Sequence, residues 1–426
     1  MNNLTSGSVL RAMGAFSLPY FLSYFLQTLY GMADLFIIGQ FEGAAGITAV
    51  SIGSQVMHML TVMLVGLSMG ATVVTAQFVG AGKRACIQTA AGTAMMVFLL
   101  ISLLLTAAGG MTSGWIVGLM ETPAEAAAET ERYLLICFLG MPFVAAYNMI
   151  AAVFRGLGDA RHPMYFVAAA CVCNIALDYL FMGWLAMGPA GAALGTVVSQ
   201  AFSVVLALNF VRRGGAGFSL RRSDFHLDVP MMRRILRIGV PISLQDGLIQ
   251  IAFLVITVIA NMRGLTDAAA VGIVEKIISF IFLVPSSMLS TVSALGAQNI
   301  GAGKVGRAQQ MLGYALCIAV CFGLFVSVFT QYAAEGMVAL FTFDSLLIAA
   351  GAAYLKGYIL DCIFAGIHFC FSGISVPADA RNFLFFTTLF PSLRRAYRSP
   401  IWLRSGILLR FSRWGLRPRP VRWCPS

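Results

Sequence analysis

Long apolar stretches alternate with short polar ones along most of the chain. A helix needs about 20 mostly apolar residues to cross the ~30 Å hydrocarbon core of a bilayer, and its backbone must satisfy its own hydrogen bonds there. The pattern therefore predicts an all-α, polytopic membrane protein. The expected spans are residues 14–38, 47–78, 86–111, 131–154, 164–184, 189–211, 238–262, 268–299, 307–333 and 348–374.

The basic residues between the spans predict the orientation. Lys and Arg accumulate in cytoplasmic loops. If the spans alternate in direction, 14 basic residues from Arg11 to Arg307 fall on one side, whereas the opposite loops hold Arg132, Arg263 and mostly acidic residues. We therefore expect an integral protein of a bacterial cytoplasmic (inner) membrane with a cytoplasmic N-terminus. The first apolar stretch is too long for a cleaved signal peptide and is expected to remain as the first span.

Composition agrees with this reading and excludes other classes. The chain is 59% hydrophobic and 11% charged, against about 25% charged residues in soluble domains. The net charge of +11 does not indicate nucleic-acid binding, because ten of the 28 basic residues and none of the 17 acidic ones lie in the last 46 residues. The nine cysteines show no CxxC or Cys/His ligand spacing, so we expect packing residues rather than disulfides or metal ligands.

The two halves of the chain resemble each other. Residues 76–83 read AQFVGAGK and residues 297–304 read AQNIGAGK, an offset of 221 that also nearly relates Pro19 to Pro241. An even number of spans between the copies predicts a parallel duplication into two six-helix lobes, an architecture suited to alternating access. The expected units are an N-terminal lobe (1–211), a basic cytoplasmic linker (212–237), a C-terminal lobe with four secure helices (238–374) and an aberrant basic tail (375–426).

Several motifs in order resemble the multidrug and toxic compound extrusion (MATE) transporters over roughly residues 10–374. They are Asp34 followed by an apolar run to Gly39, the two AQ…GAGK segments, Phe-Arg-Gly-Leu-Gly-Asp at 154–159, and Asn174 with Asp178. The resemblance implies twelve helices in two lobes around a V-shaped cavity. It also implies export of drugs coupled to H⁺ or Na⁺.

Acidic residues inside spans are candidate functional groups, because a carboxylate in hydrocarbon is costly. Asp34 lies late in the first span, and Asn174 and Asp178 lie four residues apart on one helical face. Burial and a second nearby carboxylate both favour a protonated acid, and the same oxygens could hold Na⁺. The resemblance implies that Asp34, Asn174 and Asp178 form the cation-coupling site. No cofactor is expected, and no metal beyond Na⁺ at Asp34 and Asp178.

The second lobe offers further polar residues. Asp361 matches a family carboxylate implicated in cation binding. Another family pattern has an acid eight residues after the proline of the seventh span, but here that position is Ile249, followed by Gln250. This departure weakens the case for a sodium site in the second lobe. Asp246 could partly replace the missing acid. The second-lobe candidates are Asp246, Glu275 and Gln245.

A substrate cavity between the lobes would be lined by adaptable and aromatic side chains. Met is soft and flexible, and aromatic faces attract cations. The weak candidates for the lining are Gln55, Tyr30, Met32, Met63, Phe253 and Phe280. The expected partners are small organic molecules, mostly cations, and the lipid bilayer, with no obligate protein partner.

The tail after about Gly373 changes character. Residues 413–426 can be encoded so that a shifted frame resembles residues 187–199, where a complete duplication places the twelfth span. We therefore expect a frameshift near 374–380. The alternative is a native basic tail that binds anionic lipid.

Four functions compete at this point. The first is a drug or cation antiporter. The second is a flippase for lipid-linked glycans, which would need cationic cavity residues for pyrophosphate, whereas the spans offer mainly acids plus Lys276 and Lys356. The third is a membrane-embedded enzyme. A GxSxG match at 66–70 lies inside an apolar stretch and no HExxH exists, so no enzyme is expected. The fourth is a non-functional truncated remnant.

Overall fold

The computed structural model describes residues 4–215, 224–263 and 265–375, and in these ranges every regular element is a helix. The all-α prediction is confirmed there. The elements are α1 (Val9–Phe41), α2 (Ala44–Gly80), α3 (Arg84–Leu119), α4 (Ala124–Gly156), α5 (Arg161–Asp178), the π-helix η1 (Tyr179–Trp184), α6 (Gly188–Arg212), α7 (Val229–Arg263), α8 (Leu265–Ile281), α9 (Leu283–Gly301), α10 (Val305–Ala339), α11 (Ser345–Tyr358) and α12 (Asp361–Ser375).

The helices account for the ten expected spans. Among the described residues, nine helical stretches are long and apolar enough to cross a membrane, and the α11–α12 pair, bent by 40°, brings the number to ten. Most helices extend several residues beyond the expected bounds. Helix α7 begins at Val229, so residues 229–237, which were expected to be linker, are helical. The tail, with the proposed frameshift, lies outside the described residues.

One expected span, 268–299, is interrupted. Helix α8 ends at Ile281 and α9 begins at Leu283, with Pro285 in the first turn of α9. A proline lacks a backbone donor and its ring clashes with the carbonyl four residues earlier, here that of Ile281. The break therefore falls one turn before the proline.

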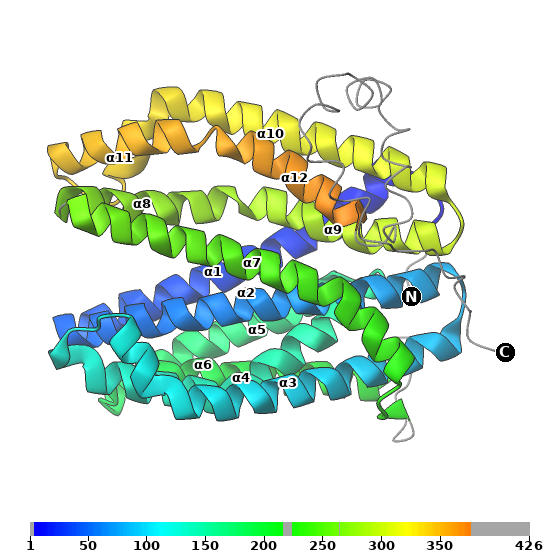
Figure 1. The fold of residues 1–426 in the computed structure, drawn as a ribbon, viewed down its shortest axis with the longest axis horizontal. Coiled ribbons are helices and arrows are strands. Elements are labelled where there is room, and N and C mark those ends of the chain that lie inside the picture. Colours follow the sequence, from blue (N-terminus) through cyan, green and yellow to red (C-terminus); the bar gives the residue numbers. More distant parts are fainter. Residues whose placement is uncertain (1–3, 216–223, 264, 376–426) are drawn as a thin grey trace, which may run out of the picture.

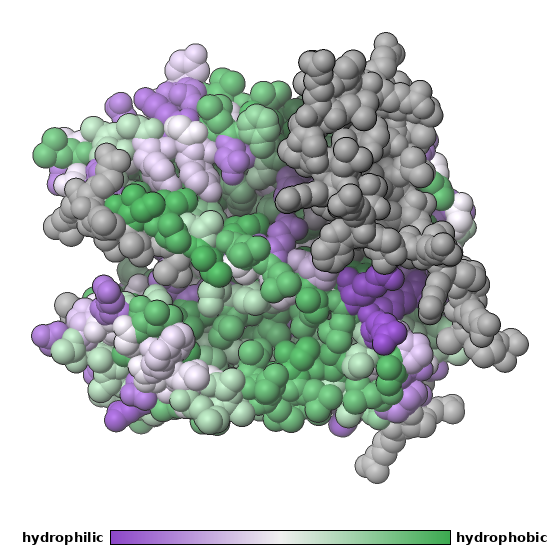
Figure 2. Space-filling model, in the orientation of Figure 1, coloured by the Kyte–Doolittle hydropathy of each residue, from purple (hydrophilic) through white to green (hydrophobic). Residues whose placement is uncertain are grey.

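The helices form two layers (Figure 1). Helices α1–α6 make up the blue to teal layer, and α7–α12 make up the green to orange layer. Many large apolar side chains point outward, for example Leu104 and Trp115, each 68% exposed. Green apolar residues also cover much of the visible face of the N-terminal layer (Figure 2). Such a surface suits lipid rather than water.

The first helix of each half crosses to the opposite lobe. Met13 and Phe16, early in α1, belong to a core cluster with Leu295 of α9. Ile235, early in α7, belongs to the large core cluster of α2, α3, α4 and α6. The two crossings are therefore related by the same duplication that relates the sequences.

The repeated AQ…GAGK segments contact each other. A Cβ added at Gly80 would collide with the Gln298 carbonyl oxygen, and one added at Gly301 would collide with that of Gln77. Nearby, Gln298 Nε2 donates to the Gly156 carbonyl oxygen at 2.9 Å. In Figure 1 both turns lie at the same end of the molecule as the N-terminus. The lobes thus meet backbone to backbone at this end.

Candidate functional site

The N-terminal lobe brings together three of the four residues proposed for cation coupling; the fourth, Asp361, lies on α12. Asp34 comes from α1, and Asn174 and Asp178 come from α5, with side chains that are 4%, 1% and 0% exposed. The Asp178 carboxyl group and the Asn174 side chain both lie beside the Asp34 carboxyl group. Residues at least 140 positions apart thus form one buried polar group. Asp34 and Asp178 of this group are called the N-lobe carboxyl pair below.

Helix α6 completes this group with residues that the sequence did not indicate. Thr196 Oγ1 donates a hydrogen bond of 3.3 Å to Asp34 Oδ2. A Cβ on the preceding residue, Gly195, would collide with Asp178 Oδ1. Only a glycine therefore allows the Asp178 carboxyl group to rest against the α6 backbone. A threonine and a glycine in an apolar span give no signal that distinguishes them from packing residues.

The polar atoms of the group are only partly satisfied. Within the described ranges, no hydrogen bond reaches Asp34 Oδ1, either carboxyl oxygen of Asp178, or the side-chain oxygen and nitrogen of Asn174. Buried polar atoms are normally paired. Several converging oxygens in an apolar setting match the preference of hard cations for oxygen ligands, and two adjacent carboxyl groups can also share a proton. The residues present therefore fit either H⁺ or Na⁺.

The end of α5 is irregular at this site. Asp178 is the last α-helical residue, and the π-helix η1 follows directly. Single π turns frequently occur at functional sites. Tyr133 and Cys137 of α4 belong with Met182 of η1 to the apolar cluster around the group.

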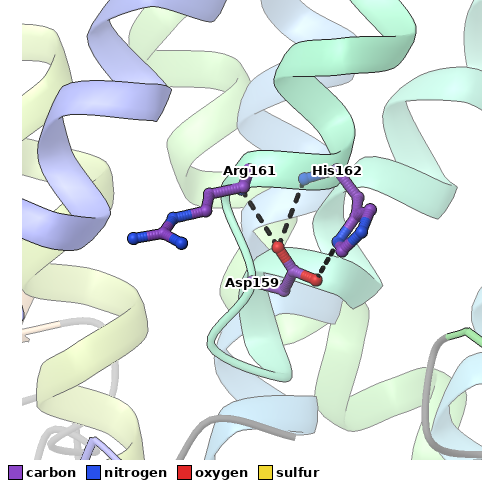
Figure 3. Close-up of polar contacts among 3 residues, drawn as sticks. All are labelled: Asp159, Arg161 and His162. Atoms are coloured by element: carbon purple, nitrogen blue, oxygen red, sulfur yellow. Dashed lines mark hydrogen bonds and ion pairs between the residues drawn. The ribbon is translucent and has the colours of Figure 1, made fainter.

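The start of α5 is fixed by Asp159, part of the 154–159 motif (Figure 3). Asp159 Oδ1 accepts backbone N–H bonds from Arg161 at 3.0 Å and His162 at 3.2 Å, and Oδ2 contacts His162 Nδ1 at 2.5 Å. The His162 ring also packs against Phe210, with ring centroids 4.2 Å apart. The Arg161 guanidinium points away from Asp159. Asp159 therefore caps the helix that carries Asn174 and Asp178.

In the second lobe, Glu275 lies apart from the N-lobe carboxyl pair. Its Oε1 accepts a hydrogen bond of 3.1 Å from Thr257 Oγ1. Tyr354 and Tyr358 are close enough to interact with its charge. Lys276, the next residue, forms no ion pair with it in the described structure, as expected for adjacent helical positions.

The remaining second-lobe candidates do not form one site with Glu275. Asp361 is exposed at the start of α12, near Tyr358. Gln245 Nε2 lies 3.0 Å from His368 Nε2. Asp246 is partly buried on α7, where its Oδ2 lies against Gly66 of α2.

The six residues proposed for the substrate cavity are scattered. Tyr30 lies beside Asp34 rather than between the lobes. Phe280 packs across the lobes on Phe25 of α1, with ring centroids 6.1 Å apart, and Phe253 packs on Tyr358 at 6.4 Å. Met63 lies against Gly247. Gln55 is exposed on α2, and Met32 is partly buried on α1.

Comparison with known proteins gives consistent matches. The sequence profile of the MatE family matches residues 19–180 and 241–393. The "Probable multidrug resistance protein YpnP" of Bacillus subtilis is 27% identical, with 89% of this chain and 84% of that protein covered. The "Multidrug export protein MepA" of Staphylococcus aureus is 25% identical, with 86% and 81% covered. The second profile match extends past 374–380, the region of the expected frameshift.

Solved structures share the fold. A structure described as the outward-facing conformation of a multidrug resistance MATE family transporter superposes with a TM-score of 0.80 at 22% identity, covering 88% of this chain and 85% of that one. A transporter of the MOP superfamily from Pyrococcus furiosus, whose description reports reverse polarity of the binding pocket, has a TM-score of 0.78 at 21% identity, with 91% of both chains covered.

Proposed function

The chain belongs to the MatE family, whose relatives here are named as multidrug resistance and export proteins, and from this premise we propose that it exports small organic cations in exchange for H⁺ or Na⁺. It is an integral membrane protein with the fold of solved MATE transporters. The proposed coupling ion binds at Asp34, Asn174 and Asp178. The cationic nature of the substrate and the exchange mechanism are the parts that need testing.

The observation that carries the proposal is the buried, incompletely hydrogen-bonded N-lobe carboxyl pair. Two carboxyl groups that are at most 4% exposed cannot both stay ionised without compensation. A proton or a sodium ion supplies that compensation. Binding and release of this ion change the charge inside the lobe. Such a change can shift the equilibrium between two packing arrangements of α1, α5 and α6.

The lobe contacts support an alternating-access cycle. The two lobes touch through Gly80 and Gly301 at the end that bears the basic loops. A notch separates the layers at the opposite end of the view in Figure 2. If the basic side is cytoplasmic, as the positive-inside rule implies, the protein is closed to the cytoplasm and open outward. This orientation, with the N-terminus in the cytoplasm of a bacterial inner membrane, is part of the proposal.

The test is transport in sealed vesicles that contain the purified protein. Efflux of a fluorescent organic cation is followed after a proton gradient or a sodium gradient is imposed separately. The expected result is transport driven by at least one gradient, and its loss in Asp34→Asn and Asp178→Asn, because an amide neither takes up a proton nor neutralises a cation.

Glu335→Gln serves as the control, because Glu335 is an exposed acid near the end of α10. It is expected to transport like the unchanged protein. Undiminished gradient-driven efflux in both aspartate variants would refute the coupling assignment. Transport of a lipid-linked glycan without any gradient would instead favour the flippase function.

A further inference from the structure

We propose that Lys276, with His58 and Gln55, forms a binding site for the carboxylate of a small aromatic anion in the gap between α2 and α8. The inference goes beyond the proposed export of organic cations and does not depend on it. The site is separate from the N-lobe carboxyl pair, because its residues come from α2 of the first lobe and α8 of the second.

The first step concerns the direction in which one face of α8 points. Gly272, Lys276 and Phe280 are spaced four residues apart, so they share this face. The Phe280 ring packs on Phe25 of α1, and Lys276 interacts through its charge with His58 of α2. The face that carries Lys276 is therefore turned toward the N-terminal lobe.

The second step concerns the space in front of this face. A Cβ added at Gly272 meets nothing within 4 Å, and Lys276 and His58 are both exposed. Gln55 is exposed as well, three residues before His58 and on the same face of α2. The notch between the layers in Figure 2 lies at the end where α8 begins. These polar side chains therefore border open space rather than a packed core.

The third step concerns the charge at the site. Among the described residues, Lys276 forms no ion pair, and the side chains of His58 and Gln55 form no hydrogen bond. A charged ammonium group in a membrane span is costly without a partner. The neighbouring acid, Glu275, accepts its hydrogen bond from Thr257 of α7. The positive charge of Lys276 is therefore available to a ligand.

The fourth step concerns the kind of ligand. Ammonium, imidazole and carboxamide groups all donate hydrogen bonds, and a single ammonium charge matches a single carboxylate. The Phe25–Phe280 ring pair lies one turn from Lys276 and suits an aromatic body. Lys276 lies about 16 Å along α8 from its first residue, Leu265. This depth favours a small molecule that enters through the gap over the headgroup of a lipid.

The experiment measures binding of naphthoate, an aromatic monovalent carboxylate, to the purified full chain by equilibrium dialysis in uncharged detergent. Lys276→Gln is expected to raise the Kd at least about tenfold, the size of a lost charge-assisted contact. Lys276→Arg keeps the charge and is expected to retain most of the affinity, whereas His58→Leu loses one donor and is expected to lose less than Lys276→Gln. Lys356→Gln, on α11, is the matched lysine control.

Naphthamide, the neutral counterpart of naphthoate, gives a test on the unchanged protein and is expected to bind at least about tenfold more weakly. Equal affinity for the two compounds overturns the proposal, as does an unchanged Kd in folded Lys276→Gln. An equal loss in Lys276→Gln and Lys276→Arg would indicate a packing role and also overturns it. Size-exclusion elution and thermal unfolding check the folding of each variant. If Lys276→Gln does not fold, the naphthamide comparison and His58→Leu decide.

Discussion

At the scale of single residues, the N-lobe carboxyl pair depends on a position without a side chain. Asp178 rests against Gly195, where a Cβ would collide with its Oδ1. Thr196, the next residue, donates to Asp34. Two adjacent positions of α6 therefore orient both carboxyl groups, although neither position can itself carry charge.

Gly195→Ala is predicted to displace the Asp178 carboxyl group while the protein stays folded. We expect affinity for the coupling ion to fall by about 10- to 100-fold, the range found when groups that orient ion ligands are changed. The measurement is the dependence of dye efflux on the driving ion's concentration. Gly118→Ala is the control, since a Cβ there meets nothing within 4 Å. Equal ion dependence in both variants would contradict the prediction.

At the scale of elements, α5 is held at both ends by features that differ from an ordinary helix. Asp159 caps its first turn, and η1 continues it past Asp178 as a π-helix. The length of α5 between these two features determines where along the helix axis Asn174 and Asp178 lie in the lobe. We therefore expect the 154–159 motif to affect the proposed coupling residues indirectly, through the position of this helix.

Asp159→Ala is predicted to destabilise the start of α5 by about 1 kcal/mol, because two backbone N–H groups lose their acceptor. Thermal unfolding in detergent measures the change in stability. Asp159→Asn keeps an oxygen that can accept the same two bonds, so it is expected to be close to the unchanged protein. A loss in Asp159→Asn as large as that in Asp159→Ala would assign the effect to the His162 contact instead of the cap.

At the scale of the whole molecule, the two repeated AQ…GAGK segments form a reciprocal contact between the lobes. Gly80 rests on the backbone of the second repeat, and Gly301 rests on that of the first. Helices α1 and α7 each begin on the opposite lobe. If the lobes separate at this end during transport, both contacts break together, because they are symmetric copies of one another.

Gly80→Ala and Gly301→Ala are each predicted to open this end, since an added methyl group in such a contact typically costs about 1–3 kcal/mol. Spin labels at Arg84 and Val305, in a chain whose nine cysteines are replaced, would report a longer distance in both variants. Gly306→Ala is the control, because a Cβ there meets nothing within 4 Å. An unchanged distance in both repeat variants would show that these glycines do not hold the lobes together.

The sequence by itself determined the helical class, the number of spans up to residue 375 and the duplication. Apolar length and loop charge follow directly from the bilayer as solvent, so they can be read without coordinates. The order of motifs identified the family. Intramembrane acids pointed to Asp34 and Asp178, because charge is costly there, and Asn174 lies on the same helical face as Asp178. The bounds of α7 and the break before Pro285 were less accessible, because helix ends depend on caps and packing.

Only the tertiary structure decided which residues meet. Thr196 and Gly195 look like any small residues of an apolar span, and their role follows from the crossing of α6 and α5. Tyr30 was expected in a substrate cavity but lies beside Asp34, while Asp246 lies against Gly66 of the other lobe. Periodicity shows which face of a helix a residue occupies, but not which helix covers that face. That choice is made by packing between residues far apart in the chain.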